Sequence, residues 1–298
     1  MEIGNFKRFF YKCIIFFLLS FRVLAEKETI AIVVPSASTP LSGIFDRIID
    51  GVAKSTPQFE KKTLLLNEDS RDSLKKWLVT HKLFAVIAIG DKASLFARSV
   101  SINSPIITSG SLLVSNASEH VGVSLSIDED TLKKKLLFYL PHIKKLHVGD
   151  EGGNIIWFSN SVGFPQIVRN KISSDQKTVI KYLWKTINNV DPKTEAVWIN
   201  SNIEHYFLYK LSERAWERKV TLISNNIDHL ESGSLMAFHP DFEAMGERLG
   251  AILAMTESGL PPLEPLRAIE QGVNLRTAKH LDINITPLLE KNFGVIIK

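Results

Sequence analysis

Small polar side chains gather in five short turns of this sequence, and such side chains can bind ligands. Each turn follows a run of apolar residues. Serine, threonine, asparagine and glycine in such places can hydrogen-bond small polar molecules. The same residues also cap helices, so every turn has a purely structural interpretation beside the functional one. The turns are Ser36–Thr39, Asp91–Ser94, Thr108–Ser111, Asp150–Asn154 and Asn200–Asn202.

Asp91 admits two interpretations, which differ in the ligand that they allow. As a carboxylate at the start of a helix, it occupies the position that a ligand carboxylate would otherwise take. This favours a neutral or cationic ligand group unless Lys92 compensates. As a plain N-cap, it has no part in binding. The candidate ligand-binding residues of all five turns are Ser36, Thr39, Asp91, Lys92, Ser109, Ser111, Asn154, Asn200 and Asn202.

Patterns for catalysis or metal binding are missing from the sequence. It holds no GxSxG, HExxH or GxxxxGK[ST] pattern, and an SxxK match at 174–177 lacks its companion motifs. His142 and His147 have no zinc-ligand partners at helical spacing, and His239 before Pro240 is interpreted as a helix-start residue. We therefore predict no catalytic residues, no metal and no cofactor, and a protein that is not an enzyme.

An alternation of strands and helices positions the first three turns. The run TIAIVVP at 29–35 predicts a strand buried on both faces. The alternation predicts a doubly wound parallel sheet, in which ligands bind beyond the carboxyl ends of the strands. Further strands are predicted at 63–66, 84–89 and 105–107, and helices at 41–54, 74–81 and 92–100.

A second block of the same kind follows the extended stretch HVGVSL at 120–125. Ser126–Glu129 has the spacing of a capping box, and we expect its helix to end before Pro141. Trp157 is the tryptophan predicted to border a turn of this block. Strands are predicted near 146–148, 166–168 and 196–199, and helices near 155–162, 174–188 and 203–217.

The last block contains a helix that follows His239. Pro240 is predicted at its first position, where the missing N–H costs nothing. Gly246 and Gly250 are four residues apart, which places them on one helix face and permits a close approach to a neighbouring element.

The first 25 residues have the pattern of a cleavable signal peptide. Basic residues at 7, 8 and 12 precede a short apolar run at 13–21, and Val23-Leu24-Ala25 resembles a cleavage site. A membrane anchor is the alternative, but the run falls short of the roughly 20 residues that a span requires. We expect a periplasmic protein that begins at Glu26 and has lost Cys13, its single cysteine.

The basic character of the chain comes from this leader. The whole chain has 36 Lys and Arg against 32 Asp and Glu, of which the leader holds four and one, so that 32 and 31 remain. A net charge near +1 gives no footprint for nucleic acid, and we predict no nucleic-acid partner. We expect a monomer.

Several segments resemble a known family. FAVIAIGDKAS at 84–94, HVGVSL at 120–125 and the tail segments at 233–262 and 273–292 are similar to ABC-transporter substrate-binding proteins related to tryptophan- and tyrosine-binding periplasmic proteins. The resemblance implies two doubly wound parallel-sheet α/β lobes joined by a hinge, as in type I periplasmic binding proteins. It implies one lobe near 26–122 plus 235–262 and the other near 123–234 plus 263–298.

Three loops depart from the family pattern. Asp91 stands where the family has a small hydroxyl residue, and the loops at 107–111 and 224–228 also differ. The resemblance implies the solute-binding component of an ABC importer, which captures a small molecule by hinge closure and presents it to a membrane permease. Because the altered loops are where family members hold ligand, a periplasmic sensory or accessory protein that signals to a membrane partner stays an alternative.

Overall fold

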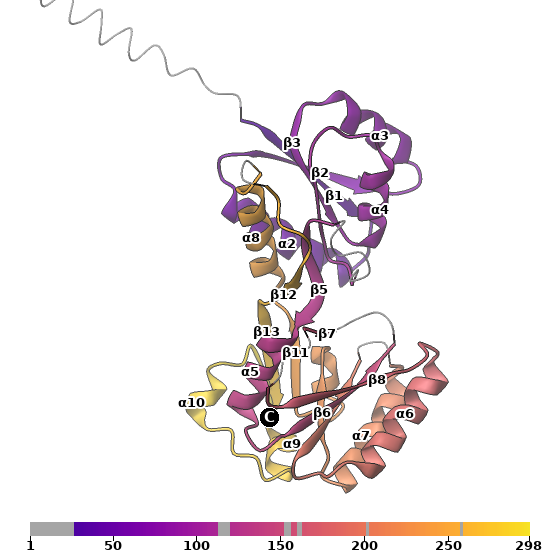
Figure 1. The fold of residues 1–298 in the computed structure, drawn as a ribbon, viewed down its shortest axis with the longest axis vertical. Helices are drawn as coiled ribbons and strands as arrows, with labels where there is room; N and C mark the ends of the chain where they lie inside the picture. Colours follow the sequence, from indigo (N-terminus) through magenta and orange to yellow (C-terminus); the bar gives the residue numbers. More distant parts are fainter. Residues whose placement is uncertain (1–26, 113–119, 152–155, 160–162, 201–202, 257–258) are drawn as a thin grey trace, which may run out of the picture.

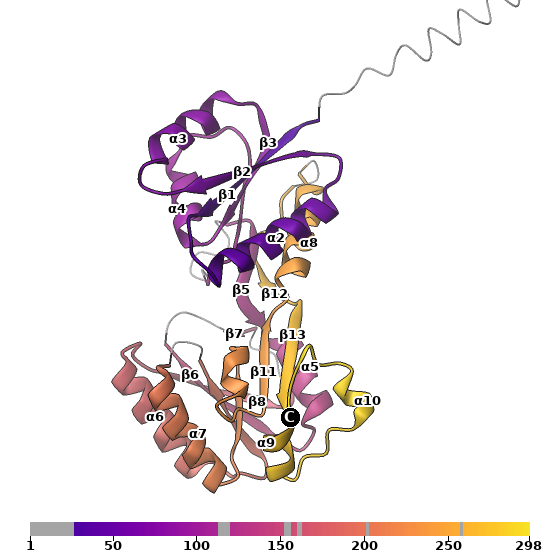
Figure 2. The same cartoon turned by 180° about the vertical axis from the view of Figure 1, so that it is seen from behind.

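The computed structural model describes residues 27–112, 120–151, 156–159, 163–200, 203–256 and 259–298. Over this part of the chain the protein forms two lobes, one above the other (Figure 1). The reverse view shows the same division, with extended segments running through the junction of the lobes (Figure 2).

The first lobe is built on a sheet in which the described residues form seven strands, all paired in parallel. The run at 29–35 is an inner strand of this sheet. Its alternate residues enter two different cores: Ile30 and Ile32 lie in one, Ala31 and Val33 in the other. The strands in spatial order are β12 (Glu264–Leu266), β5 (Gly122–Asp128), β4 (Ile106–Ser109), β3 (Leu83–Ile89), β1 (Thr29–Pro35) and β2 (Glu60–Leu66), with β7 (Ile156–Trp157) paired to β5.

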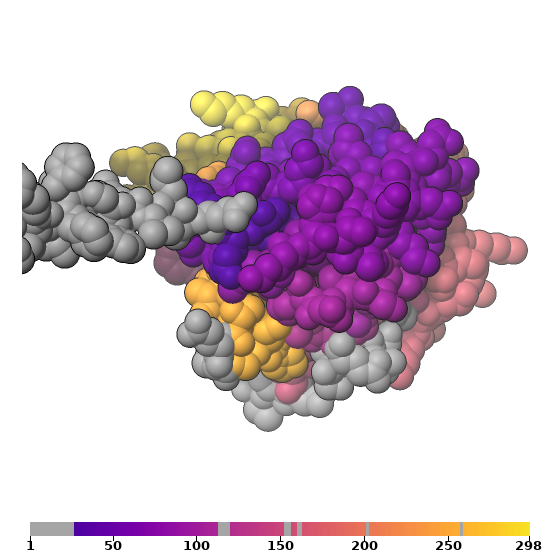
Figure 3. Space-filling model, turned by 90° about the horizontal axis from the view of Figure 1, so that it is seen from above, coloured from indigo at the N-terminus to yellow at the C-terminus, as the bar shows by residue number. Residues whose placement is uncertain are grey.

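Helices cover both faces of this sheet. On one face, α3 (Arg71–Thr80) and α4 (Asp91–Ser99) bury Leu78 and Phe96. On the other face, α2 (Leu41–Ser55) and α8 (Phe242–Leu253) bury Ile48 and Met245. The late segment α8 is coloured orange in Figure 3, where it lies against the purple first lobe.

Glycines make the contact between α2 and α8. A methyl group added to Gly246 would lie 2.8 Å from the backbone nitrogen of Val52 and would overlap the carbonyl oxygen of Ile48. A methyl group on Gly250 would lie 2.9 Å from Cβ of Ser55 and would overlap the hydroxyl oxygen of that side chain. The prediction that Gly246 and Gly250 permit a close helix approach is therefore confirmed.

The second lobe has a sheet of similar design. All its strand pairs are parallel except β11 with β13. The described strands in spatial order are β14 (Val295–Ile297), β13 (Ile269–Asn274), β11 (Met236–Pro240), β10 (Thr221–Ser224), β9 (Glu195–Ile199), β6 (Lys145–Asp150) and β8 (Gln166–Lys171). Its helices are α5 (Glu129–Tyr139), α6 (Gln176–Asn189), α7 (His205–Glu217), α9 (Leu275–His280) and α10 (Pro287–Glu290), with the 3₁₀ turn η2 (Ile227–Leu230).

The two lobes with their parallel-dominated sheets confirm the predicted fold class. Three passages between the sheets follow the carboxyl end of a strand, because β5 leads into α5, β11 into α8 and β12 into β13. The division into lobes at residues 122, 234 and 262 stays a prediction about folding units.

The predicted capping box at Ser126–Glu129 is wrong. The N-cap of α5 is Asp128, whose carboxylate accepts a hydrogen bond from the backbone N–H of Thr131 at 2.9 Å. Ser126 lies inside β5 and is fully buried. Pairing with the neighbouring strands extends β5 to Asp128, and this long-range pairing overrides the local capping signal.

Two further element predictions are wrong. Ile156 and Trp157, predicted in a helix at 155–162, form β7 beside the end of β5. Residues 155 and 160–162 lie outside the described residues. Pro240 ends β11, opposite Ile269, and Asp241 is the N-cap of α8. In both places pairing with a strand that is distant in the sequence decides the conformation, and the local sequence does not reveal this pairing.

Among the described residues, none of the helices is both long enough and apolar enough to cross a membrane.

Candidate functional site

The carboxyl edges of the two sheets point toward one another. β5 is parallel to its neighbours in the first sheet, and its carboxyl end leads into the second lobe. β11 is parallel to β10 in the second sheet, and its carboxyl end leads into the first lobe. Because ligands of parallel α/β sheets bind beyond this edge, the turns after the strands of both lobes flank one candidate site between the lobes (Figure 1).

The turns after β3 and β4 come together on the first-lobe side. The hydroxyl of Ser111 donates a hydrogen bond to the carboxylate of Asp91, and the backbone N–H of Gly90 donates to the carbonyl of Ser109 at 2.7 Å. Ser36, Thr39, Asp91 and Lys92 are exposed, whereas Ser109 and Ser111 are buried. Within this predicted set, the side chains of Asp91 and Ser111 contact each other.

Ser109 carries a buried hydroxyl without a partner. Its side-chain oxygen makes no hydrogen bond, and the residue is only 1% exposed at the end of β4. A buried polar atom left without a partner costs about 1–3 kcal/mol, so such an atom requires an explanation. Because Ser109 ends β4 at the carboxyl edge, a ligand in the candidate site is well placed to supply the missing hydrogen-bond partner.

Asn200 is the matching residue on the second-lobe side. Its amide nitrogen donates to the carbonyl oxygen of Gly149 at 3.3 Å and to the carboxylate of Glu151. Its amide oxygen is buried and has no hydrogen-bond partner. Asn154 and Asn202, the other predicted residues of this lobe, lie outside the described residues.

A charged cluster at the end of β6 is a feature that the predicted residue set missed. The buried carboxylate of Asp150 accepts a hydrogen bond from Nε of Arg169 at 2.6 Å. The Arg169 guanidinium lies 4.2 Å from the centre of the Phe158 ring, a cation–π arrangement. Asp150 is the first residue of a predicted turn, but Arg169 lies on β8, opposite Val148, and only the pairing of β8 with β6 brings it near Asp150.

A second buried ion pair fastens the start of α5 to the segment after β7. Lys133 lies 2.6 Å from Glu129, and both side chains are less than a tenth exposed. The other oxygen of Glu129 accepts a hydrogen bond from the backbone N–H of Ser159 at 2.7 Å. Trp157 is half-buried in β7, paired to the first sheet rather than placed in the second.

Charged side chains also tie the lobes together at their junction. Arg47 on α2 lies 2.7 Å from Glu270 on β13 and 3.9 Å from Asp241. Arg267, between β12 and β13, lies 3.9 Å from both Asp128 and Glu264. The Arg47–Glu270 pair therefore connects a helix of the first lobe to the sheet of the second.

The turn after β10 is held by a buried histidine. A ring nitrogen of His229 lies 2.8 Å from the hydroxyl of Ser224, the last residue of β10. Burial, which penalises the charged imidazolium, lowers the pKa of His229 to about 4. The ring is therefore neutral at physiological pH and acts as a structural support beside the site.

This neutral histidine should make stability depend on pH. The unfolded chain binds a proton near pH 6.5, its ordinary histidine pKa, whereas the folded protein does so only near pH 4. Stability should therefore fall as the pH drops through this window, by an amount on the order of 3 kcal/mol. Urea unfolding at pH 7.5 and pH 4.5 should show a smaller loss for His229→Gln than for the wild type. Equal losses in both proteins would contradict this assignment.

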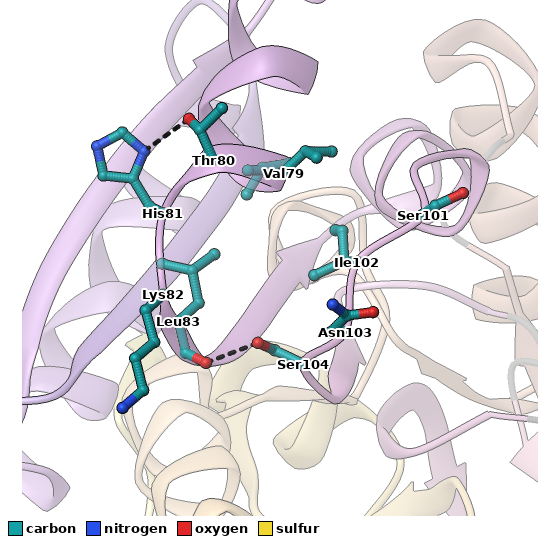
Figure 4. Close-up of a pocket in the computed structure, with 10 residues that line it drawn as sticks. Val79, Thr80, His81, Lys82, Leu83, Ser101, Ile102, Asn103 and Ser104 are labelled. Atoms are coloured by element: carbon teal, nitrogen blue, oxygen red, sulfur yellow. Dashed lines mark hydrogen bonds between the residues drawn. The ribbon is translucent and has the colours of Figure 1, made fainter.

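One hollow of the first lobe lies away from the carboxyl edge of its sheet. One cavity of about 430 Å³ is lined by residues at the end of α3, the start of β3 and the turn before β4. Figure 4 shows His81 and Lys82 pointing away from Ile102 and Asn103, while the hydroxyl of Ser104 donates to the carbonyl of Leu83 at 2.6 Å. This cavity lies at the amino edge of the first sheet, the wrong edge for ligands of such a fold. Within the described ranges, no group of three or more histidine, cysteine, aspartate or glutamate side chains could hold a metal ion.

Comparison with known proteins shows the fold. No protein-family model and no curated protein sequence matches this chain. A ligand-free, open substrate-binding protein with adhesive properties from Clostridium difficile is similar in structure, with a TM-score of 0.62, 16% identity and coverage of 91% of this chain and 99% of its own. An ABC domain in complex with L-Trp from Streptococcus pneumonia has a TM-score of 0.53, 17% identity and coverage of 91% and 100%. The fold is that of type I periplasmic binding proteins.

Proposed function

We propose that this protein is the solute-binding component of an ABC-type importer. It captures a small organic solute between its two lobes and is not an enzyme. The observation that carries the proposal is a pair of buried atoms without partners, the hydroxyl oxygen of Ser109 and the amide oxygen of Asn200. They belong to opposite lobes, at the two carboxyl edges that point toward each other. A ligand held between the lobes would supply both missing hydrogen bonds.

The similar proteins support this proposal. One of them holds L-Trp and another is described as a substrate-binding protein in an open, ligand-free state. The leader at 1–25, with its basic residues and apolar run, supports delivery to the periplasm, where such a component would act.

The position of the two atoms supports hinge closure as part of the proposal. A ligand that hydrogen-bonds to both Ser109 and Asn200 binds the closed state better than the open one. This difference in affinity shifts the population of molecules toward the closed state. The junction at β5, β11 and β12 would take up the rotation. A permease in the membrane would then receive the closed form.

A sensory role for the same site is the second candidate. Asp91 stands in one of the loops that depart from the family pattern, and its carboxylate is already engaged by Ser111. A protein that only signals to a membrane partner would close on that partner rather than on a solute alone. Neighbouring permease and ATPase genes would favour import, and a neighbouring membrane kinase or cyclase would favour sensing.

One experiment tests the proposal in its main parts. Native mass spectrometry of the protein purified from its own host should find a chain that begins at Glu26 and carries a bound small molecule. Adding that molecule to the emptied protein should reduce the radius of gyration in small-angle scattering while circular dichroism stays unchanged. A bound solute without compaction would contradict hinge closure, and a chain that retains Met1 would contradict export by cleavage.

A further inference from the structure

We infer that the site recognises a protonated amine, and that Asn200 is the residue that reads it. The inference rests on the proposed solute-binding function and adds the chemical class of the ligand. It follows from which hydrogen-bonding atoms at the two carboxyl edges are already used and which are left over.

The orientation of the Asn200 amide is decided by its neighbours. The two partners of its nitrogen, the carbonyl oxygen of Gly149 and the carboxylate of Glu151, can only accept hydrogen bonds. The NH₂ group must therefore face them, and the amide oxygen must face the opposite way. That oxygen is an acceptor, buried and without a partner. A hydrogen-bond donor satisfies this oxygen, whereas a second acceptor does not.

The carboxylates at the same edges also accept and cannot donate. Glu151 binds the Asn200 amide, and Asp91 across the site receives the hydroxyl of Ser111. Asp91 also opens α4, so it places a negative charge where the helix N-terminus would otherwise attract an anion. An ammonium group would meet acceptors on both lobes.

Arg169, one of the two cations on β8, is engaged elsewhere. Arg169 lies against the buried carboxylate of Asp150 and over the face of the Phe158 ring. Lys92 beside Asp91 and Lys171 at the carboxyl end of β8 are exposed, and an anionic ligand would recruit these two side chains. A ligand carboxylate would also meet the Asn200 oxygen, which repels it because both groups are acceptors. The arrangement at these edges therefore favours an amine over an acid.

Three four-carbon solutes that differ in their end groups test the inference. Putrescine carries two ammonium groups, 1,4-butanediol two hydroxyls and succinate two carboxylates. Calorimetric titration of the full mature protein should rank their affinities in that order, with putrescine at least about ten-fold tighter than succinate. Asn200→Asp puts an acceptor oxygen against the Gly149 carbonyl and the Glu151 carboxylate, so the side chain should lose its orientation and bind putrescine less tightly. Asn200→Leu should weaken putrescine binding at least about ten-fold.

Asn189→Leu is the matched control. Asn189 donates to the carbonyl of Lys185 near the end of α6, away from the strand ends, so its replacement should leave every affinity unchanged. Tighter binding of succinate, lost in Asn200→Leu, would overturn the amine assignment and keep the binding function. Absence of binding by all three solutes, together with no co-purified molecule, would overturn the binding function as well. Equal putrescine affinities in wild type, Asn200→Asp and Asn200→Leu would remove Asn200 from the site.

Discussion

Replacing Gly246 with alanine is expected to cost about 3 kcal/mol of folding stability, at the upper end of the range for overpacked cores. The new methyl group would meet backbone atoms of α2, namely the carbonyl of Ile48 and the nitrogen of Val52, and neither can rotate away. The two helices would have to separate along a buried face that includes Val52 and Leu249, both fully buried. Chemical unfolding monitored by circular dichroism measures the loss.

Gly43 supplies the control for this substitution. It lies in α2 as well, but a methyl group there meets nothing within 4 Å. Gly43→Ala should stabilise the protein by roughly 0.5–1 kcal/mol, because alanine loses less backbone entropy than glycine on forming a helix. Similar changes in stability for the two substitutions would show that α2 and α8 do not pack closely enough to exclude a side chain at Gly246.

Removing the two atoms without partners should abolish most of the ligand affinity. Each lost hydrogen bond should weaken ligand binding by about ten-fold. Because the free-energy changes of separate sites add, Ser109→Ala combined with Asn200→Leu should weaken binding by about 100-fold. Ser109→Ala alone should hold or raise stability, because it removes a buried hydroxyl that has no partner in the free protein. Affinity for the co-purified solute and urea unfolding give the two readouts.

Ser212 supplies a control that separates the expected effect on stability from the expected effect on ligand affinity. Its hydroxyl is also buried without a partner, but it lies on α7 and not at a strand end. Ser212→Ala should therefore match Ser109→Ala in stability while binding the solute as the wild type does. A Ser109→Ala protein that binds normally would remove the first-lobe contact from the proposed site.

Periodicity in the sequence was sufficient for most of the elements. The run at 29–35 is apolar at every position from Ile30 to Val34, so it had to be buried on both faces, and β1 divides its residues between two cores. Gly246 and Gly250 predicted the close helix contact because a spacing of four residues places them on one face. The predictions of a capping box at Ser126 and of a helix start at Pro240 were wrong for the same reason. Pairing with distant strands sets the ends of β5 and β11.

The amino-acid sequence by itself determined the α/β alternation, the two lobes and the polar turns at the strand ends, because these depend on residues close together in the chain. Tertiary structure decided which side chains meet: Asp91 with Ser111, Arg169 with Asp150, and Arg47 with Glu270, which is 223 residues away. It also decided that Ser109 and Asn200 end without partners. Whether a buried polar atom finds a partner depends on every segment packed around it, and that information is spread over both lobes.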